Sequence, residues 1–113
     1  MQVKVRNVQR VAILDISGRV VIGDALYVLR RHVRDVMNDG YKKLILNMEG
    51  VSYIDSAGIG ELVSSYTTVT TQGGELKLVK TTQRVKDLLH MTKLLTIFES
   101  YHNEKDAIAS FNC

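Results

Sequence analysis

The residues best placed for chemistry lie in the string Asp55-Ser56-Ala57-Gly58, where a strand pattern gives way to a helix pattern. The apolar run Leu44 to Leu46 is typical of a buried strand, and after a loop the apolar residues from Ile59 onward recur at helical spacing. The serine hydroxyl is therefore expected at a helix N-terminus, where unpaired N–H groups and a partial positive charge favour an anion. Phosphorylation of Ser56 would place about −1.5 to −2 charges there, so the sequence indicates a possible phosphorylation switch.

Ser56 also has a purely structural interpretation, because a serine before an amphipathic helix is commonly an N-cap. Gly58 and Gly60 favour the functional interpretation. They leave little side-chain bulk around the hydroxyl, and each costs roughly 1 kcal/mol in a helix interior. We therefore expect both glycines to serve close approach by a partner, and we expect Gly58→Ala to raise thermal stability if the backbone there is helical. The site is also expected beyond the carboxyl end of a parallel strand, where open α/β sheets tend to place function.

Other residue combinations do not predict catalysis or metal binding. His32, His90 and His102 are far apart in sequence and lack acidic or cysteine neighbours at ligand spacing. The string around Ser56 does not match the Gly-x-Ser-x-Gly pattern of hydrolases, and Gly58-Ile59-Gly60 is not a dinucleotide-binding fingerprint. We expect a protein that is not an enzyme and needs no cofactor or metal.

Length and composition limit the chain to one globular domain, residues 1–113. The sequence is 45% hydrophobic and 24% charged, which argues against disorder, and its apolar runs are too short to span a membrane. The only cysteine is Cys113, so no intrachain disulfide can form, which fits a reducing cytoplasm. The net charge is +3, and its densest basic cluster is interpreted as a solvated helix face and not a nucleic-acid surface, because no base-stacking aromatics accompany Arg30, Arg31, His32 and Arg34.

Strand and helix patterns alternate through most of the chain, which predicts right-handed crossovers and a parallel portion of sheet after an antiparallel opening pair. The expected strands are 3–6, 11–16 (ended by Gly18), 43–48, 75–80 and a short one at 97–98. The expected helices run from a Gly23-Asp24 cap to Asn38, over 56–71, from Thr81 or Thr82 through Leu89, and over 106–111. The fold class is therefore α/β: a single small domain with a mixed sheet of about four to five strands and about four helices.

The fifteen-residue string from Leu46 to Gly60 resembles the signature of the STAS domain, specifically that of the bacterial anti-sigma factor antagonists. The resemblance covers nearly the whole chain. It implies that Ser56 is phosphorylated by a partner that is both a serine kinase and an anti-sigma factor, and that a phosphatase resets it. The unphosphorylated protein would bind this partner and release the sigma factor, with no direct contact to nucleic acid or membrane. The partner-binding residues implied by the resemblance are Asp24, Asp55, Ser56, Ala57, Gly58, Ile59 and Gly60.

Two segments depart from the family pattern. Members often carry an acidic residue shortly after the first conserved glycine, whereas here Gly18 is followed by Arg19-Val20-Val21 and the nearest acid is Asp24. The Ser/Thr-Gly pair that is common before the last apolar segment is replaced by Thr92-Lys93. One alternative is a STAS scaffold or interaction module without its own kinase switch. Another is a small enzyme or carrier that binds a phosphorylated metabolite at the helix N-terminus, against which the scarcity of other placed polar groups argues.

Overall fold

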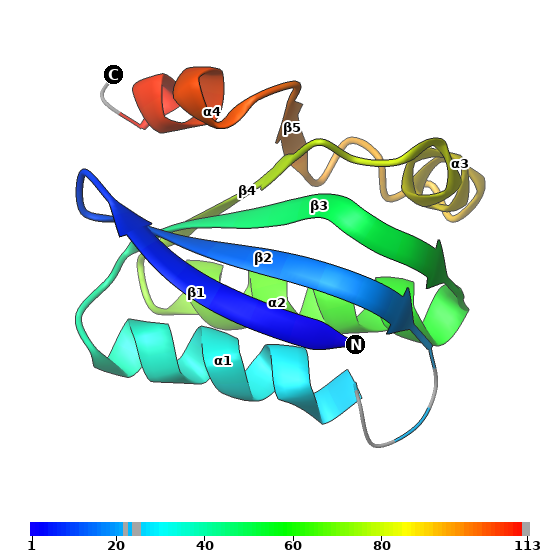
Figure 1. Ribbon diagram of the computed structural model, residues 1–113, viewed down its shortest axis with the longest axis horizontal. Helices are drawn as coiled ribbons and strands as arrows, with labels where there is room; N and C mark the ends of the chain where they lie inside the picture. The colour runs from blue at the N-terminus through cyan, green and yellow to red at the C-terminus, as the bar shows by residue number, and fades with distance from the viewer. Residues whose placement is uncertain (22, 24–25, 112–113) are drawn as a thin grey trace.

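The computed structural model describes residues 1–21, 23 and 26–111, in which the chain forms five strands and four helices (Figure 1). The sheet has the order β1-β2-β3-β4-β5, the same order as in the chain. The elements, in sequence, are β1 (Gln2–Val8), β2 (Val11–Val20), α1 (Leu26–Asn38), β3 (Lys43–Ile54), α2 (Ser56–Thr71), β4 (Glu75–Val79), α3 (Gln83–Met91), β5 (Glu99–Tyr101) and α4 (Glu104–Ser110).

The pairing of the strands confirms the expected mixed sheet. β1 and β2 form an antiparallel hairpin, and β2, β3, β4 and β5 pair in parallel. Gln9 and Arg10 at the hairpin turn both have positive φ angles, 51° and 68°, a pair of values typical of the tight turn whose twist matches that of the strands. The predicted α/β class with an antiparallel opening pair is therefore correct.

Two strands are longer than their sequence patterns predicted. Gly18 does not end β2, which continues to Val20, and the loop expected after Met48 is strand, because β3 continues to Ile54. Along this extension, β3 has one more residue than β2 at each of two bulges. The first bulge lies between the pairs Asp15↔Asn47 and Ser17↔Gly50, and the second lies between Gly18↔Val51 and Arg19↔Tyr53. Such bulges bend a strand and break its side-chain alternation, and β3 curves toward the start of α2 (Figure 1).

The short last strand lies two residues later than expected. The pairing residues are Glu99–Tyr101 and not Ile97 and Phe98. Phe98 instead turns into the core, where its ring meets that of Tyr66 edge to face at a centroid distance of 5.4 Å. An aromatic side chain adds more to stability in this packing than at an exposed sheet edge, which explains why the strand begins after it.

The core has two parts, one on each side of the sheet. α1 and α2 cover one side, and α4 lies on the other (Figure 1). The larger cluster contains Leu14, Leu46 and Leu78 with the inner faces of α1 and α2, and α3 adds Val85 and Leu89 to it. The smaller cluster lies between the opposite side of the sheet and α4. The predicted inward residues of the last helix, Ala107, Ile108 and Phe111, are buried in it.

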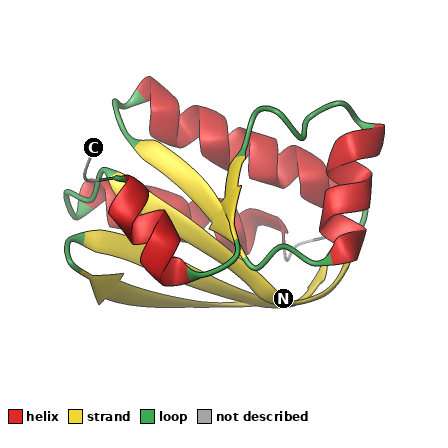
Figure 2. Ribbon diagram, turned by 90° about the horizontal axis from the view of Figure 1, so that it is seen from above, coloured by secondary structure: helices red, strands yellow, loops and turns green. Residues whose placement is uncertain are grey.

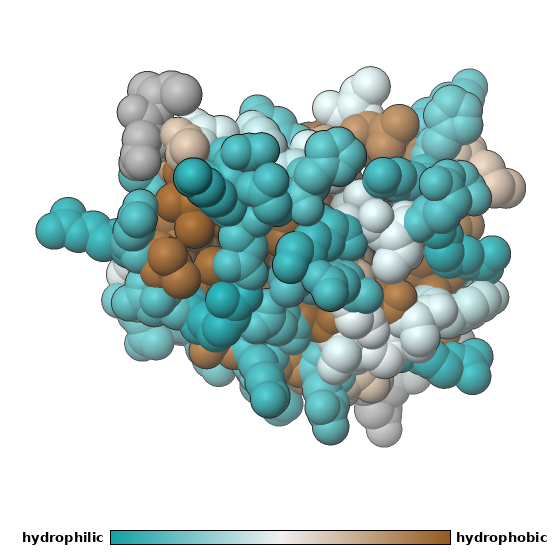
Figure 3. Space-filling view, turned by 45° about the horizontal axis from the view of Figure 1, so that its top comes forward, coloured by the Kyte–Doolittle hydropathy of each residue, from teal (hydrophilic) through white to brown (hydrophobic). Residues whose placement is uncertain are grey.

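The side of the sheet that carries α4 is covered only in part (Figure 2). The surface seen with α3 and α4 turned forward is mostly hydrophilic, and apolar atoms show only in separate patches (Figure 3). Charged and polar groups of β1, β2, β3 and α4 occupy part of this side, joined by hydrogen bonds from Arg6 to both Asp15 and Glu104 and from Asn47 to Asp15. Within the described residues, no helix is long and apolar enough to cross a membrane.

Candidate functional site

Ser56 is the first residue of α2 and its side chain is exposed. The N-cap is Asp55, whose extended backbone (φ −112°, ψ −176°) precedes the helix and whose Oδ1 accepts a hydrogen bond of 2.9 Å from the N–H of Gly58. The structural interpretation of Ser56 as an N-cap is therefore wrong. Among the residues that the structure describes, the Ser56 hydroxyl makes no hydrogen bond, so chemistry at this oxygen would not remove a cap.

The backbone around Ser56 presents donors to an anion. The N–H of Asp55 bonds to the carbonyl of Val20 at the end of β2, and the N–H of Gly58 is satisfied by the Asp55 cap. The N–H groups of Ser56 and Ala57 belong to the first turn, where no preceding helical carbonyl exists to accept them. α2 has 16 residues, so this terminus also carries the partial positive charge of a full helix dipole.

Gly58 is buried within the protein, not open to a partner. A Cβ atom added there would lie 2.2 Å from the carbonyl oxygen of Val20 and 2.7 Å from Cγ1 of Ile54. Such distances are far inside van der Waals contact, so the close approach that this glycine serves is internal, between the start of α2 and the end of β2. The expectation that Gly58→Ala raises thermal stability is therefore wrong.

Gly60 differs from Gly58. It is exposed in the second turn of α2, and an added Cβ would meet nothing within 4 Å. Of the other residues predicted to bind a partner, Asp55 and Ala57 are half-buried, and Ile59 is buried in the core. Asp24 lies outside the described residues. The directly accessible part of the predicted set is thus Ser56 and Gly60, with Asp55 and Ala57 beside them.

Two arginines flank an exposed tyrosine next to this helix terminus. Tyr53 is the last residue but one of β3 and 38% exposed. The guanidinium carbons of Arg19 and Arg84 lie 5.3 Å and 4.5 Å from its ring centroid, within the range of a cation–π interaction. Arg84 Nε also donates to the carbonyl oxygen of Ile54 at 3.3 Å. In the described part of the chain, neither arginine forms an ion pair with a carboxylate.

No pattern in the sequence connects Tyr53 with the two arginines. Arg19 reaches it through the register of β2 on β3, which the second bulge sets. Arg84 reaches it from the first turn of α3, 30 residues further along the chain than Ile54. The predicted helix cap at Thr82 placed Arg84 in the first turn of a helix, but it did not indicate which residues Arg84 would contact.

The basic cluster on α1 is only partly the solvated face that was expected. Arg31 and Arg34 are exposed. Arg30 instead forms a two-point hydrogen-bonded ion pair with Glu61 on α2, at 3.1 and 2.9 Å. His32 is half-buried, with its Nδ1 2.7 Å from the carbonyl of Val28. The described residues contain no group of three or more His, Cys, Asp or Glu side chains that could hold a metal ion.

Comparison with known proteins agrees with this architecture. The family model for the STAS domain matches residues 2–107. The anti-sigma-B factor antagonist of Bacillus subtilis (strain 168) is 33% identical over 86 residues, which cover 76% of this chain and 77% of that protein.

Solved structures show the same likeness. A crystal structure from Thermotoga maritima, provisionally named as an anti-sigma factor antagonist, has a TM-score of 0.88 and 26% identity, covering 98% of this chain and 95% of that one. The anti-sigma factor antagonist SpoIIAA in its unphosphorylated form gives a TM-score of 0.81 at 18% identity, covering 98% and 96%. SpoIIAA in its phosphorylated form gives 0.75 at 18% identity, covering 97% and 99%. The chain therefore belongs to the STAS domain family, and among its relatives are bacterial anti-sigma factor antagonists.

Proposed function

We propose that this protein is a cytoplasmic anti-sigma factor antagonist controlled by phosphorylation of Ser56. The unphosphorylated form binds an anti-sigma factor that is also a serine kinase, and the sigma factor is released. Phosphorylation of Ser56 weakens the complex, and a phosphoserine phosphatase restores binding. The observation that carries this proposal is the exposed Ser56 hydroxyl at the first position of α2, with the cap supplied by Asp55 instead.

The proposed binding surface joins α2 to the arginine pair. Ser56 and Gly60 provide its open part, Asp55 and Ala57 its edge, and Arg19, Tyr53 and Arg84 extend it across the ends of β2, β3 and α3. Gly58 and Ile59 act from beneath, by holding the first turn of α2 against the sheet. Tyrosine and arginine are enriched at the energetic centres of protein interfaces, which supports this extension.

Charge explains how a phosphate at Ser56 would act. In the free protein, the helix N-terminus offers donors to the phosphate, and water and salt screen its repulsion from Asp55. In a complex that excludes water, the same charges interact more strongly and the phosphate loses its hydration. The penalty falls mainly on the bound state, so the switch needs no refolding of the domain.

Phosphorylation is tested with a candidate anti-sigma factor that has a serine-kinase domain, taken from the organism that makes this protein. After incubation with that protein and Mg-ATP, intact-mass analysis is expected to show one added phosphate on the wild type and none on Ser56→Ala. Ser52→Ala is the matched control, since Ser52 is also exposed and lies four residues away on β3. Continued labelling of Ser56→Ala would assign the phosphate to another residue. Binding to this partner without labelling would support the scaffold alternative.

The local character of the switch is tested with Ser56→Asp. We expect this variant to bind the anti-sigma factor more weakly than the wild type in calorimetry, because the added carboxylate imitates part of the phosphate charge. Its amide NMR spectrum should change only at residues 53–62 and at their immediate neighbours. Shifts that spread through α1 or β4 would contradict a local mechanism.

A further inference from the structure

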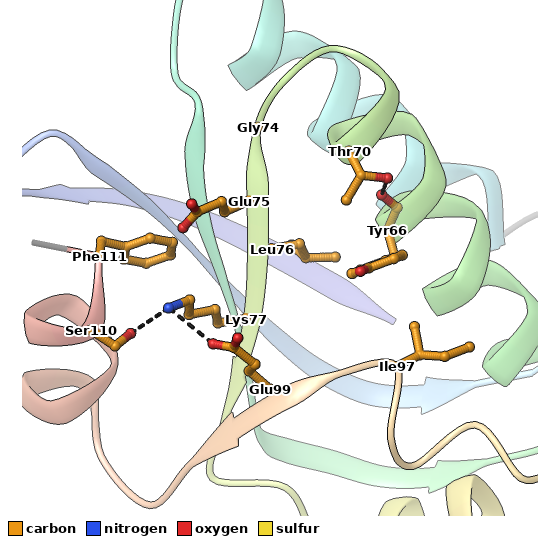
Figure 4. A pocket seen from close by; sticks show the side chains of 10 residues that line it. All are labelled: Tyr66, Thr70, Gly74, Glu75, Leu76, Lys77, Ile97, Glu99, Ser110 and Phe111. Carbon is orange, nitrogen blue, oxygen red and sulfur yellow. Dashed lines mark hydrogen bonds and ion pairs between the residues drawn. The ribbon is translucent and has the colours of Figure 1, made fainter. Parts of the chain in front are cut away.

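A second site lies away from Ser56, at the edge of β4 (Figure 4). It is a pocket of about 390 Å³, within the size range of small-molecule sites. The second half of α2, the start of β4, the segment that enters β5 and the end of α4 form its walls. β5 pairs only with Lys77–Val79, so it leaves the edge of β4 at Glu75 and Leu76 uncovered. None of the residues predicted to bind the anti-sigma factor lines this pocket.

We propose that this pocket binds a small monocarboxylate with an aromatic or branched aliphatic body, whose carboxylate pairs with Lys77. The proposal goes beyond the phosphorylation switch and does not depend on it.

The proposal is based on Lys77, a charged residue in a buried position. Its side chain is only 8% exposed, and it is the one buried cation in the part of the chain that the structure describes. Its Nζ donates to the Ser110 hydroxyl at 2.6 Å and lies 4.4 Å from the ring centroid of Phe111. Removing an ammonium group from water is unfavourable, and a protein with a well-packed apolar side chain at such a position is often no less stable. Stability of the fold therefore gives little reason for a lysine here.

The two members of the Lys77 ion pair differ strongly in solvent exposure. Its carboxylate partner, Glu99, lies 3.0 Å away but is 64% exposed on the three-residue strand β5. The hydrogen bond from Lys77 lowers the pKa of Glu99, so this partner is ionised at neutral pH. A ligand carboxylate could take its place, because Glu99 would return to water while the buried ammonium kept an anionic partner. Replacement of one carboxylate by another leaves the charge on Lys77 balanced throughout.

The remaining walls define the class of ligand. Glu75 and Lys77 point to the same side of β4, toward the end of α4, while Leu76 points toward Tyr66 (Figure 4). Tyr66 and Ile97, both half-buried, offer an apolar surface for the body of the ligand beside the buried Leu76. Glu75 and Glu99 place two negative charges beside the single positive charge of Lys77. A ligand with one negative charge is tolerated there, whereas a phosphate ester or dicarboxylate meets repulsion.

Phenylacetate is the probe that tests this site. In an NMR titration of the full chain, we expect saturable amide shifts at 75–77, 97–99 and 110–111. Phenylacetamide, which has the same shape but no charge, and phenyl phosphate, which has an additional charge, should bind at least about tenfold more weakly, a difference of about 1.4 kcal/mol. Equal binding of all three compounds, or shifts elsewhere in the chain, would overturn the proposal.

Variants test the role of Lys77. Lys77→Met should weaken phenylacetate binding at least about tenfold, while Glu99→Gln should tighten it several-fold, because the internal competitor loses its charge. Lys86→Met is the matched control, because Lys86 is an exposed residue of α3, and this variant should bind phenylacetate as the wild type does. If the amide spectrum shows that Lys77→Met is unfolded, the binding measured for Glu99→Gln decides whether the proposal holds. Unchanged or weaker binding by Glu99→Gln, or wild-type binding weaker than about 10 mM, would mean that Lys77 serves only its structural ion pair.

Discussion

Gly58 and Gly60 are two residues apart in the same helix and have opposite surroundings. Gly58 faces the backbone at the end of β2, whereas Gly60 faces solvent. The sequence marked both as unusual for a helix but could not distinguish them, because the carbonyl of Val20 that excludes a side chain at Gly58 is 38 residues away in the chain. The sequence could therefore predict that both glycines are unusual in a helix. It could not predict the neighbouring atom that requires a glycine at position 58.

The first prediction uses these two glycines as a matched pair. Gly58→Ala should lower the free energy of unfolding by about 2–3 kcal/mol, because the new methyl group overpacks against backbone that cannot move aside easily. Gly60→Ala should raise it by up to about 1 kcal/mol, since alanine is the better helix former and has open space there. Urea denaturation of both variants measures this. An unchanged midpoint for Gly58→Ala would contradict the close contact with Val20.

Gly60→Ala also provides a second prediction, about the proposed partner. If the anti-sigma factor approaches the backbone of α2 closely, the added methyl group should weaken binding although the domain itself becomes more stable. Calorimetry against that partner separates the two effects. Unchanged affinity would show that the partner does not reach the surface of α2 at this turn.

At the scale of elements, α1 and α2 are joined by an ion pair whose carboxylate is buried. Glu61 is 4% exposed and accepts two hydrogen bonds from Arg30, which reaches it from α1. A carboxylate in this position depends on its partner, because loss of one member leaves a buried charge uncompensated.

The third prediction follows from this dependence. Arg30→Met should lower the free energy of unfolding by about 3 kcal/mol, whereas Arg34→Met, at an exposed position on the same helix, should change it by less than about 0.5 kcal/mol. The double variant Arg30→Met/Glu61→Met should recover much of the loss, since no charge is then left unpaired. Equal stability of the two single variants would contradict a role for the pair in holding α1 on α2.

Helices could be predicted from the sequence better than strands. The expected span of α2, 56–71, agrees with the structure, because its apolar spacing is helical and Gly73 and Gly74 end it. β3 was predicted six residues too short, since its two bulges interrupt the alternation that identifies a strand. Bulges arise from the register against β2, a pairing between distant segments that no local pattern records.

At the scale of the whole molecule, one charged network connects the first strand to the last helix. Arg6 on β1 donates to Asp15 on β2 and to Glu104 at the start of α4, and Asn47 on β3 donates to Asp15 as well. The hydrogen bond from Arg6 is the main cause that holds the pKa of Asp15 below its ordinary value. The network thus makes part of the stability of the domain depend on pH.

The fourth prediction is the direction of that dependence. The pKa of Asp15 is lower in the folded than in the unfolded protein, where it is about 3.9. Its contribution is therefore fully present above about pH 5 and is lost as the pH falls through the folded pKa. Wild-type protein should be more stable than Asp15→Asn at pH 7, and the difference should shrink below about pH 4. Chemical denaturation over this range measures it, and a difference that stays constant down to pH 2 would contradict the linkage.

The strands lie in the sheet in the same order as in the chain, and this order affects how the protein folds during synthesis. Each new strand finds its neighbour already in place, so a chain emerging from the ribosome can extend the sheet from one edge without leaving a gap for a later segment. The hairpin of β1 and β2 comes first and needs only a short loop closure, and each later strand adds one crossover. By the time Thr71 has left the exit tunnel, three strands and the helices α1 and α2 are present, with Ser56 at its place on α2. Synthesis then leaves the growing edge at β3 open only until β4 arrives, which shortens the time during which that edge could pair with another copy, while β1 stays at the opposite edge of the sheet.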